Sequence, residues 1–144
     1  MATDYSTKFR LTLAVAPWIH ELRFNDCVVA TPEDADAFAR ALQERYETFE
    51  RLLDVVLCLD GLDIKSGARA RFGVHRADLV RTYFRYSTRY SGAPLTRVFI
   101  ATSAVLQNVE GVIYPSRDEA IAALIANRQR DGTPELPPPR KQPA

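Results

Sequence analysis

The stretch that determines the predicted fold is Leu52–Gly73, with the sequence LLDVVLCLDGLDIKSGARARFG. Its first part, Leu53–Leu59, is an apolar run bounded by turn residues, which is typical of a buried strand. The run ends at Asp60-Gly61, and a short loop then leads into a basic segment that predicts a helix. Strand, loop and helix in this order make half of a βαβ unit. Because α/β proteins usually place their sites where such a loop meets the helix, we expect a site within residues 60–67.

The residues before this stretch predict two or three strands and a helix. Apolar and polar residues alternate along Phe9–Val15 and again along Trp18–Phe24, a period of two that is typical of strands with one buried face. A short strand, Cys27–Ala30, follows. Thr31-Pro32-Glu33-Asp34 then predicts a helix start, because threonine can cap, proline fits the first turn and the acidic pair suits the positive end of the helix dipole. We expect this helix to run to about Arg51.

The residues after the opening stretch complete an α/β pattern. The expected elements are a helix at 67–90, a strand at 95–101, a short helix at 103–109, a short strand at 112–114 and a helix at 117–130. Ser116 and Glu119 have the spacing of a capping box. The predicted fold is a mixed sheet of four to six strands with helices packed mainly on one face. We expect one domain over residues 1–130 and a disordered, proline-rich tail over residues 131–144.

Composition and charge exclude several function classes. The 144 residues carry a net charge of +1, too little for a general attraction to nucleic acid, so no nucleic-acid partner is expected. No apolar run reaches the ~18 residues of a membrane span, and the first ten residues do not resemble a signal peptide, so we expect a cytoplasmic protein. Cys27 and Cys58 lie in apolar runs and are expected to be buried thiols.

The sequence offers little for catalysis or for cofactor binding. His20 and His75 are far apart and have no ligand neighbour at helical spacing, so no metal site is expected. No phosphate-binding glycine loop, nucleophile elbow or zinc-protease motif occurs. Asp60 and Asp63 flank a turn and could act as paired acids, but Asp-Gly is more often turn chemistry. We therefore expect no cofactor and no enzyme activity.

Three stretches resemble the STAS (SpoIIAA-like) domain of bacterial anti-sigma-factor antagonists and of the cytoplasmic tails of sulfate transporters. They are VLQNVEGVIYPSRDEAIAALI at residues 105–125, VVLCLDGLDIKSG at residues 55–67, and the segment that leads through Tyr90-Ser91-Gly92 into Val98-Phe99-Ile100. The resemblance covers most of residues 9–129. It implies the STAS fold and a function in protein–protein contact.

The chain departs from the family pattern in the loop that carries the family's phosphorylation switch. Cys58 and Asp60 stand where the family has aspartate and serine, and the loop is about two residues shorter than in the antagonists. Lys65 replaces the aspartate before the phosphorylatable serine, whereas Ser66-Gly67 is retained. The resemblance therefore marks Ser66 as the phosphorylation candidate, although the changed surroundings weaken the case for a switch.

Three alternative roles are open for Ser66 in this loop. Its hydroxyl could receive a phosphate, it could help the helix N-terminus to bind an anion with Lys65 and Arg69 beside it, or it could be an ordinary N-cap. Thr102-Ser103, at the end of the next predicted strand, is expected across the same cleft.

The basic helix adds a second group of candidates. Arg81, Arg85 and Arg89 recur every four residues and form a stripe. The stripe either binds an acidic partner, nucleic acid or lipid headgroups, or is a solvated face paired with the acidic first helix. The candidate partner- or ligand-binding residues are Asp60, Asp63, Lys65, Ser66, Gly67, Arg69, Arg81, Arg85, Arg89, Thr102 and Ser103.

Two function hypotheses follow from these features. The leading one, implied by the STAS resemblance, is a non-enzymatic regulatory module that contacts a regulatory or signalling protein, with a homo-oligomer as a further option. The alternative is a module that binds a small anionic ligand or a lipid through the loop at Lys65–Gly67.

Overall fold

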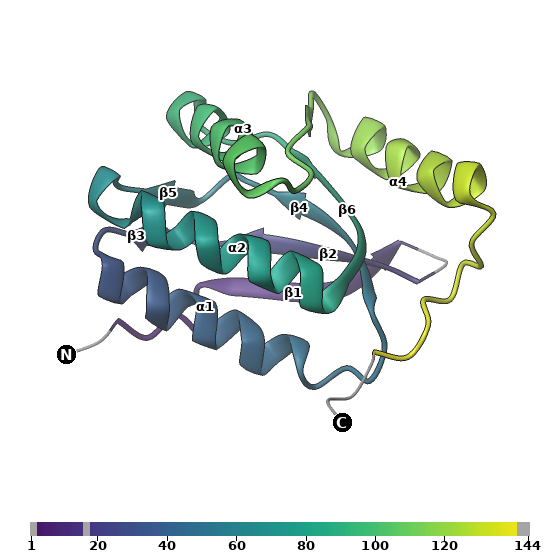
Figure 1. Cartoon of the computed structure of the whole chain (residues 1–144), viewed down its shortest axis with the longest axis horizontal. Helices are drawn as coiled ribbons and strands as arrows, with labels where there is room; N and C mark the ends of the chain where they lie inside the picture. Colours follow the sequence, from purple (N-terminus) through teal and green to yellow (C-terminus); the bar gives the residue numbers. More distant parts are fainter. Residues whose placement is uncertain (1–2, 16–17, 141–144) are drawn as a thin grey trace.

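The structure, a computed structural model, describes residues 3–15 and 18–140, which form a mixed α/β fold (Figure 1). The strands are β1 (Phe9–Val15), β2 (Ile19–Phe24), β3 (Cys27–Val29), β4 (Leu53–Cys58), β5 (Leu62–Ile64), β6 (Phe84–Tyr90) and β7 (Ile113–Tyr114). The helices are α1 (Pro32–Tyr46), α2 (Arg69–Tyr83), α3 (Pro94–Gln107) and α4 (Arg117–Asp131), with a 3₁₀ turn at Ser66–Ala68 before α2.

The main sheet has five strands in the order β1-β2-β4-β6-β7. β1 and β2 form an antiparallel hairpin, whereas β2 with β4, β4 with β6 and β6 with β7 pair in parallel. β3 and β5 form a separate parallel pair. The predicted α/β class and the mixed sheet of four to six strands are confirmed.

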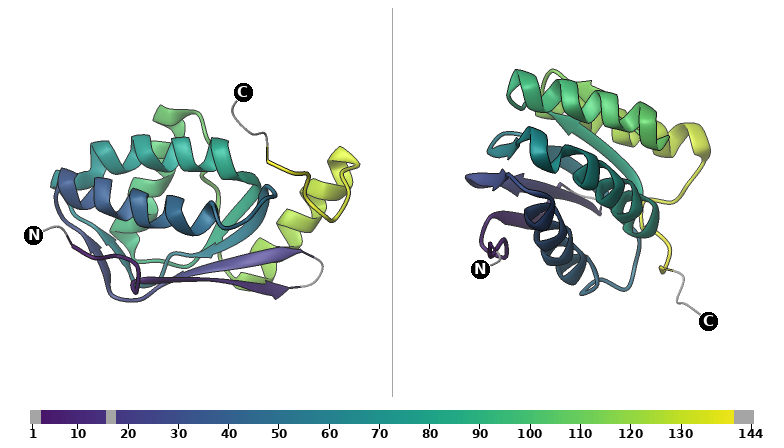
Figure 2. Two further views of the ribbon diagram at one scale, coloured as in Figure 1. Left: turned by 90° about the horizontal axis from the view of Figure 1, so that it is seen from below. Right: turned by 60° about the vertical axis from the view of Figure 1, so that its left-hand side comes forward.

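Helices cover both faces of the sheet, most of them on one. Figure 2 shows α1 and α2 side by side over one face, with α3 next to α2. On this side Val55 of β4 belongs to the larger core, whereas Val56 and Cys58 pack with Ala120 and Leu124 of α4 on the other side. Coverage of both faces explains why β4 is apolar almost throughout. Cys58 is 4% exposed, which confirms its predicted burial.

The predicted helix starts form as the sequence indicates. The Thr31 hydroxyl accepts from the Asp34 amide at 3.0 Å, and the Asp34 carboxylate accepts from the Thr31 amide at 3.3 Å, which completes a capping box. At α4 the Ser116 hydroxyl accepts from the Glu119 amide at 3.2 Å, which is one of the two hydrogen bonds of the predicted capping box. α1 ends at Tyr46, earlier than the predicted end near Arg51.

The helix predicted at residues 67–90 is wrong in its second half. α2 ends at Tyr83, and the chain continues directly as β6, where Phe84–Tyr90 has the sequence FRYSTRY. Alternating polar and aromatic residues suit a strand, and pairing with β4 on one side and β7 on the other outweighs the weak helix propensity of arginine. Arg85 and Arg89 therefore belong to a strand and not to a helical stripe.

The strand predicted at residues 95–101 is also wrong. These residues form the first half of α3, which begins at Pro94 and ends at Asn108 in a left-handed conformation, with φ of 54°. The predicted short helix at 103–109 is the second half of the same helix. α3 is the most apolar of the helices, but no helix among the described residues is long and apolar enough to cross a membrane.

The proline-rich segment after α4 follows a defined path through Arg140, which corrects the expectation of disorder from residue 131 (Figure 1). The Leu52 amide donates to the Pro138 carbonyl at 2.9 Å, and the Arg140 amide donates to the Glu50 carbonyl at 2.8 Å. The segment thus pairs with the residues that enter β4. The rest of the predicted tail, residues 141–144, lies outside the described residues.

Candidate functional site

The predicted loop site lies in an open groove between the β4–β5 turn and the start of α3. Asp60 accepts hydrogen bonds from the Ser91 hydroxyl at 2.7 Å and from the Gly92 amide at 3.0 Å, and these bonds lower the pKa of its carboxyl. Gly61 has φ of +81°, and a Cβ there would lie 2.5 Å from the Phe24 carbonyl oxygen, so only glycine fits the turn. Asp60 and Gly61 therefore hold two loops together.

The charges of this groove disfavour an anion. Lys65 forms an ion pair with Asp63 at 2.7 Å, and both side chains are half exposed. Asp26 and Asp60 line the same groove, which therefore has three carboxylates around a single amine. Such a surface repels phosphate and carboxylate groups.

Ser66 and Gly67 lie at the 3₁₀ turn before α2, on the exposed side of the chain. Lys65 is the capping residue of this turn and makes no side-chain cap, so Ser66 is not the N-cap that one reading expected. Gly67 is close to the Ala30 carbonyl, where a Cβ would lie 3.2 Å from the oxygen. The Ser66 hydroxyl is exposed, as modification would require.

Arg69 turns away from the charged groove and packs on α3. Its guanidinium lies 5.9 Å from the centre of the Phe99 ring, and its buried Nε has no hydrogen-bond partner. Thr102 and Ser103 also belong to α3 rather than to a strand end. The Ser103 hydroxyl is buried and donates to the Ile100 carbonyl at 3.2 Å, whereas Thr102 is exposed. At the groove the structure places Thr96 instead of these two residues.

The predicted arginine stripe does not form, because its three members occupy different environments. Arg81 is exposed on α2 and donates to the Gln107 carbonyl at the end of α3. Near the start of β6, Arg85 binds the buried Asp54 of β4, and Arg89, later in the same strand, is itself buried. The eleven candidates therefore do not share one functional face.

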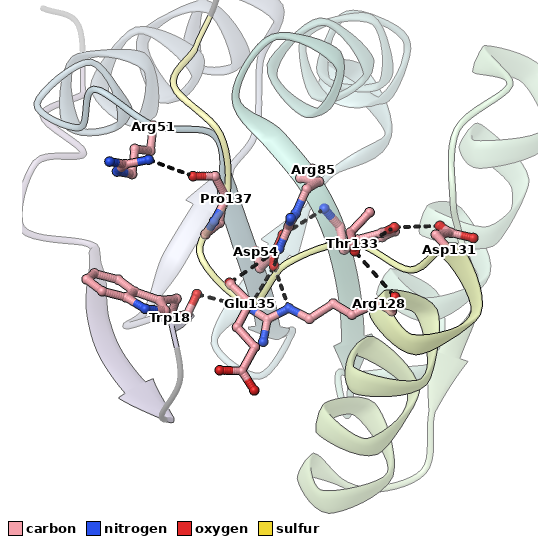
Figure 3. A network of polar contacts seen from close by, with 10 residues as sticks. Trp18, Arg51, Asp54, Arg85, Arg128, Asp131, Thr133, Glu135 and Pro137 are labelled. Atoms are coloured by element: carbon pink, nitrogen blue, oxygen red, sulfur yellow. Dashed lines mark hydrogen bonds and ion pairs between the residues drawn. The ribbon is translucent and has the colours of Figure 1, made fainter.

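A charged network that the sequence analysis missed centres on Asp54 of β4, which is fully buried (Figure 3). Arg85 binds its carboxylate through Nε at 3.0 Å and Nη2 at 2.6 Å, and Arg128 of α4 binds it through Nε at 2.8 Å. The Tyr86 amide donates to the same carboxylate at 3.2 Å, and Arg85 also reaches the Glu135 carbonyl at 3.4 Å. The network joins β4, β6, α4 and the C-terminal segment. The sequence held one sign of this network, because Asp54 is a single charged residue inside the apolar run Leu53–Leu59.

The outer side of α3 is the most exposed apolar surface of the described residues. Leu95 is 73% exposed, Val105 82% and Leu106 77%, and Val98 and Val112 add to the same area. The four helical residues lie on one side of α3 because, at 3.6 residues per turn, their positions together span only about a quarter of a turn. We call these five residues the α3 face.

The loop after α3 closes on the helix and deepens this surface into a groove. An added Cβ at Gly111 would collide with the Cβ of Ala104, so the glycine permits the close approach. Val98, Val105 and Val112 line the groove, and Arg97 is the one charged residue of α3. Apolar surfaces of this kind, with few charges, mark protein interaction sites.

No protein-family model matches the chain, and no curated protein has a matching sequence. Fold and surface together define its class as a mixed α/β domain with an uncovered apolar helix face. Among the described residues no group of three or more histidine, cysteine, aspartate or glutamate side chains could hold a metal ion.

Proposed function

We propose that the protein is a non-enzymatic regulatory module that binds another protein through the α3 face. The observation that carries this proposal is the exposure of Leu95, Val105 and Leu106 on one side of a single helix. Leaving such side chains in water costs about 1.5–3 kcal/mol each relative to burial, which a partner would recover. The STAS resemblance, whose family acts by protein–protein contact, supports the same class of function.

The residues of the α3 face indicate which side chains a partner surface should carry. An apolar centre calls for aliphatic or aromatic side chains on the partner, because such residues supply most of the binding energy at protein interfaces. Arg97 at the edge of the groove adds a preference for a carboxylate at the rim. We therefore propose a regulatory or signalling protein with an apolar patch flanked by acidic residues.

The alternative, an anion or lipid site at Lys65–Gly67, has less support. The ion pair of Lys65 with Asp63 and the two further carboxylates of the groove oppose an anionic ligand.

The test compares a Val98→Asp/Val105→Asp double variant with a Val74→Asp control, which changes an exposed valine on α2. All three proteins should unfold at similar temperatures, because the changed side chains are exposed. In cross-linking experiments in native extract, the wild type and the control should capture the same partner, and the double variant should lose it at least tenfold. Equal capture by all three proteins would overturn the proposal.

Light scattering on the purified proteins decides between a partner and a second copy. A dimer that the double variant dissociates would show that the α3 face joins two copies of this chain. A monomer in all three proteins, with partner capture by wild type and control, is the expected result.

A further inference from the structure

The two edges of the main sheet are formed by β1 and β7, and they differ in length. β7 has two residues, whereas β1 has seven, and within the described part of the chain β1 pairs with β2 alone. Phe9–Leu13 keeps a regular register with β2, and the bulge comes only after Leu13. A regular edge of this length offers its backbone to a further strand.

Every second residue of β1 directs its backbone groups away from the sheet. The Asn25 amide donates to the Lys8 carbonyl at 2.9 Å, so the backbone of Lys8 faces β2. Because consecutive residues of an antiparallel strand alternate in this respect, the amides and carbonyls of Phe9, Leu11 and Leu13 point outward. Among the described residues, no group bonds to the Phe9 backbone or to the Leu11 amide on this side.

An open groove lies between this edge and α1. Phe9 and Leu11 of β1 and Ala41 of α1 supply its apolar lining, and Glu44 and Arg45 of α1 add charges. Arg45 donates to the outward Leu11 carbonyl at 3.3 Å, so side chains of α1 reach the strand edge. The carbonyl has a second lone pair and can still accept from another amide. A strand beside β1 would place every second side chain in this groove.

The charges at the edge favour an acidic segment. Arg10 is exposed, lies directly opposite Arg23 of β2, and forms no ion pair with any described residue. Like charges opposite each other destabilise a sheet, and Arg23 has its own partner in Glu21. In the groove Arg10 and Arg45 outnumber Glu44, which leaves a net positive charge.

We propose that the β1 edge binds an extended segment of a partner protein in which acidic and small apolar residues alternate. The segment would pair with the outward backbone groups of Phe9, Leu11 and Leu13 and extend the sheet. Its apolar side chains would enter the groove with α1, and its acidic side chains, on the other face, would lie beside Arg10. The site is at the opposite edge of the sheet from β7 and is separate from the α3 face.

A second copy of the chain is a poorer occupant of this edge. A two-fold pair of β1 strands would keep both α1 helices on the same side of the joined sheet. It would also bring the Arg10 and Arg45 side chains of the two copies together at one edge, where like charges repel. A single acidic strand has neither disadvantage.

The experiment measures binding of a fluorescent peptide, Ser-Val-Glu-Val-Glu-Val-Ser with blocked ends, to the full chain by fluorescence polarisation. A peptide with lysine in place of glutamate tests the charge. A peptide methylated on two adjacent backbone nitrogens tests strand pairing, because one of any two adjacent amides must face β1. Both should bind at least tenfold more weakly than the probe. No binding of the probe, or equal binding of either altered peptide, would overturn the proposal.

Variants of the protein locate the binding. Arg10→Glu should weaken the probe at least tenfold, whereas Arg130→Glu, which reverses an exposed arginine of α4, should leave its affinity unchanged. The Val98→Asp/Val105→Asp double variant should also bind the probe as the wild type does, so a failure of the α3 face and a failure of this site are distinguishable. Equal affinity of Arg10→Glu and the wild type would overturn the proposal.

Amide hydrogen exchange on the wild type tests the edge without any substitution. In the free protein the Phe9 and Leu11 amides should exchange faster than the Arg10 and Thr12 amides, which face β2, and saturating probe should slow them. Unchanged exchange of Phe9 and Leu11 with the probe bound would overturn the site. A wild-type dimer that protects these two amides without the probe would overturn the occupant in favour of a second copy.

Discussion

The Nε of Arg128 in α4 donates to Oδ2 of Asp54 in β4 over 2.8 Å, although 74 positions separate the two residues in the chain. Arg85 of β6 binds the same carboxylate, so one buried anion holds two buried cations (Figure 3). The bond fixes the second half of α4 against the sheet.

We expect Asp54→Asn to be strongly destabilising. The variant leaves Arg85 and Arg128 without their anion, and removal of one partner of a buried ion pair costs about 3–5 kcal/mol. Urea denaturation followed by circular dichroism measures this loss. The control is Asp36→Asn, at an exposed ion pair with Arg71, which should change stability far less. Similar losses in both variants would show that the Asp54 network is not a main source of stability.

We expect the docked C-terminal segment to contribute to stability. Deletion of residues 134–144 removes two backbone hydrogen bonds to the strand entry, which together contribute about 1–3 kcal/mol. Arg140→Ala should reproduce about 1 kcal/mol of this loss, because Arg140 also lies 5.1 Å from the centre of the Tyr83 ring. Arg130→Ala, at an exposed side chain, serves as the control. A shortened chain as stable as the full one would contradict the docking.

We expect stability to fall as the pH drops below about 6.5, through His20. Burial lowers the pKa of His20 below its usual 6.5, and the Arg45 charge adds to this effect. The unfolded chain therefore binds a proton at a higher pH than the folded chain, so the stabilisation is full above pH 6.5 and is lost as the pH falls through the folded-state pKa. Urea denaturation at several pH values should show a steeper fall for the wild type than for His20→Gln. If the stability of the two proteins depended on pH in the same way, His20 would not be the source of the loss.

We expect Gly61→Ala to cost more than Gly132→Ala. Both glycines have positive φ, +81° and +64°, so both substitutions strain the backbone. Only at Gly61 does the new Cβ also collide, with the Phe24 carbonyl oxygen, whereas nothing lies within 4 Å at Gly132. The expected losses are about 2–4 kcal/mol at Gly61 and about 1–2 kcal/mol at Gly132, measured by thermal and urea unfolding. Equal losses would mean that the β4–β5 turn relaxes around the methyl group.

Elements with local signals could be predicted from the sequence, and the candidate site mostly could not. The capped starts of α1 and α4 and the apolar β4 follow from neighbouring residues, and all three were predicted. β6 was predicted as helix because Arg81, Arg85 and Arg89 recur every four residues, a spacing that also fits a helix face, whereas pairing with β4 and β7 gives the segment its strand form. The α3 face was missed because the first half of α3, with Val98-Phe99-Ile100, has the apolar run of a buried strand.

The sequence by itself determined the α/β class, the helix caps and the glycine turn after β4, because these depend on contacts within a few residues. Only the tertiary structure decided which charges are compensated. Arg85 and Arg128 meet Asp54 from elements 31 and 74 positions away, while Arg89, from the same strand as Arg85, points to the other side and forms no ion pair within the described part of the chain. The physical reason is a β-bulge. Four positions along a regular strand return a side chain to the same face, but the register of β6 against β4 shifts between Leu53 and Asp54, where Arg85 is the extra residue, and this puts Arg85 and Arg89 on opposite faces.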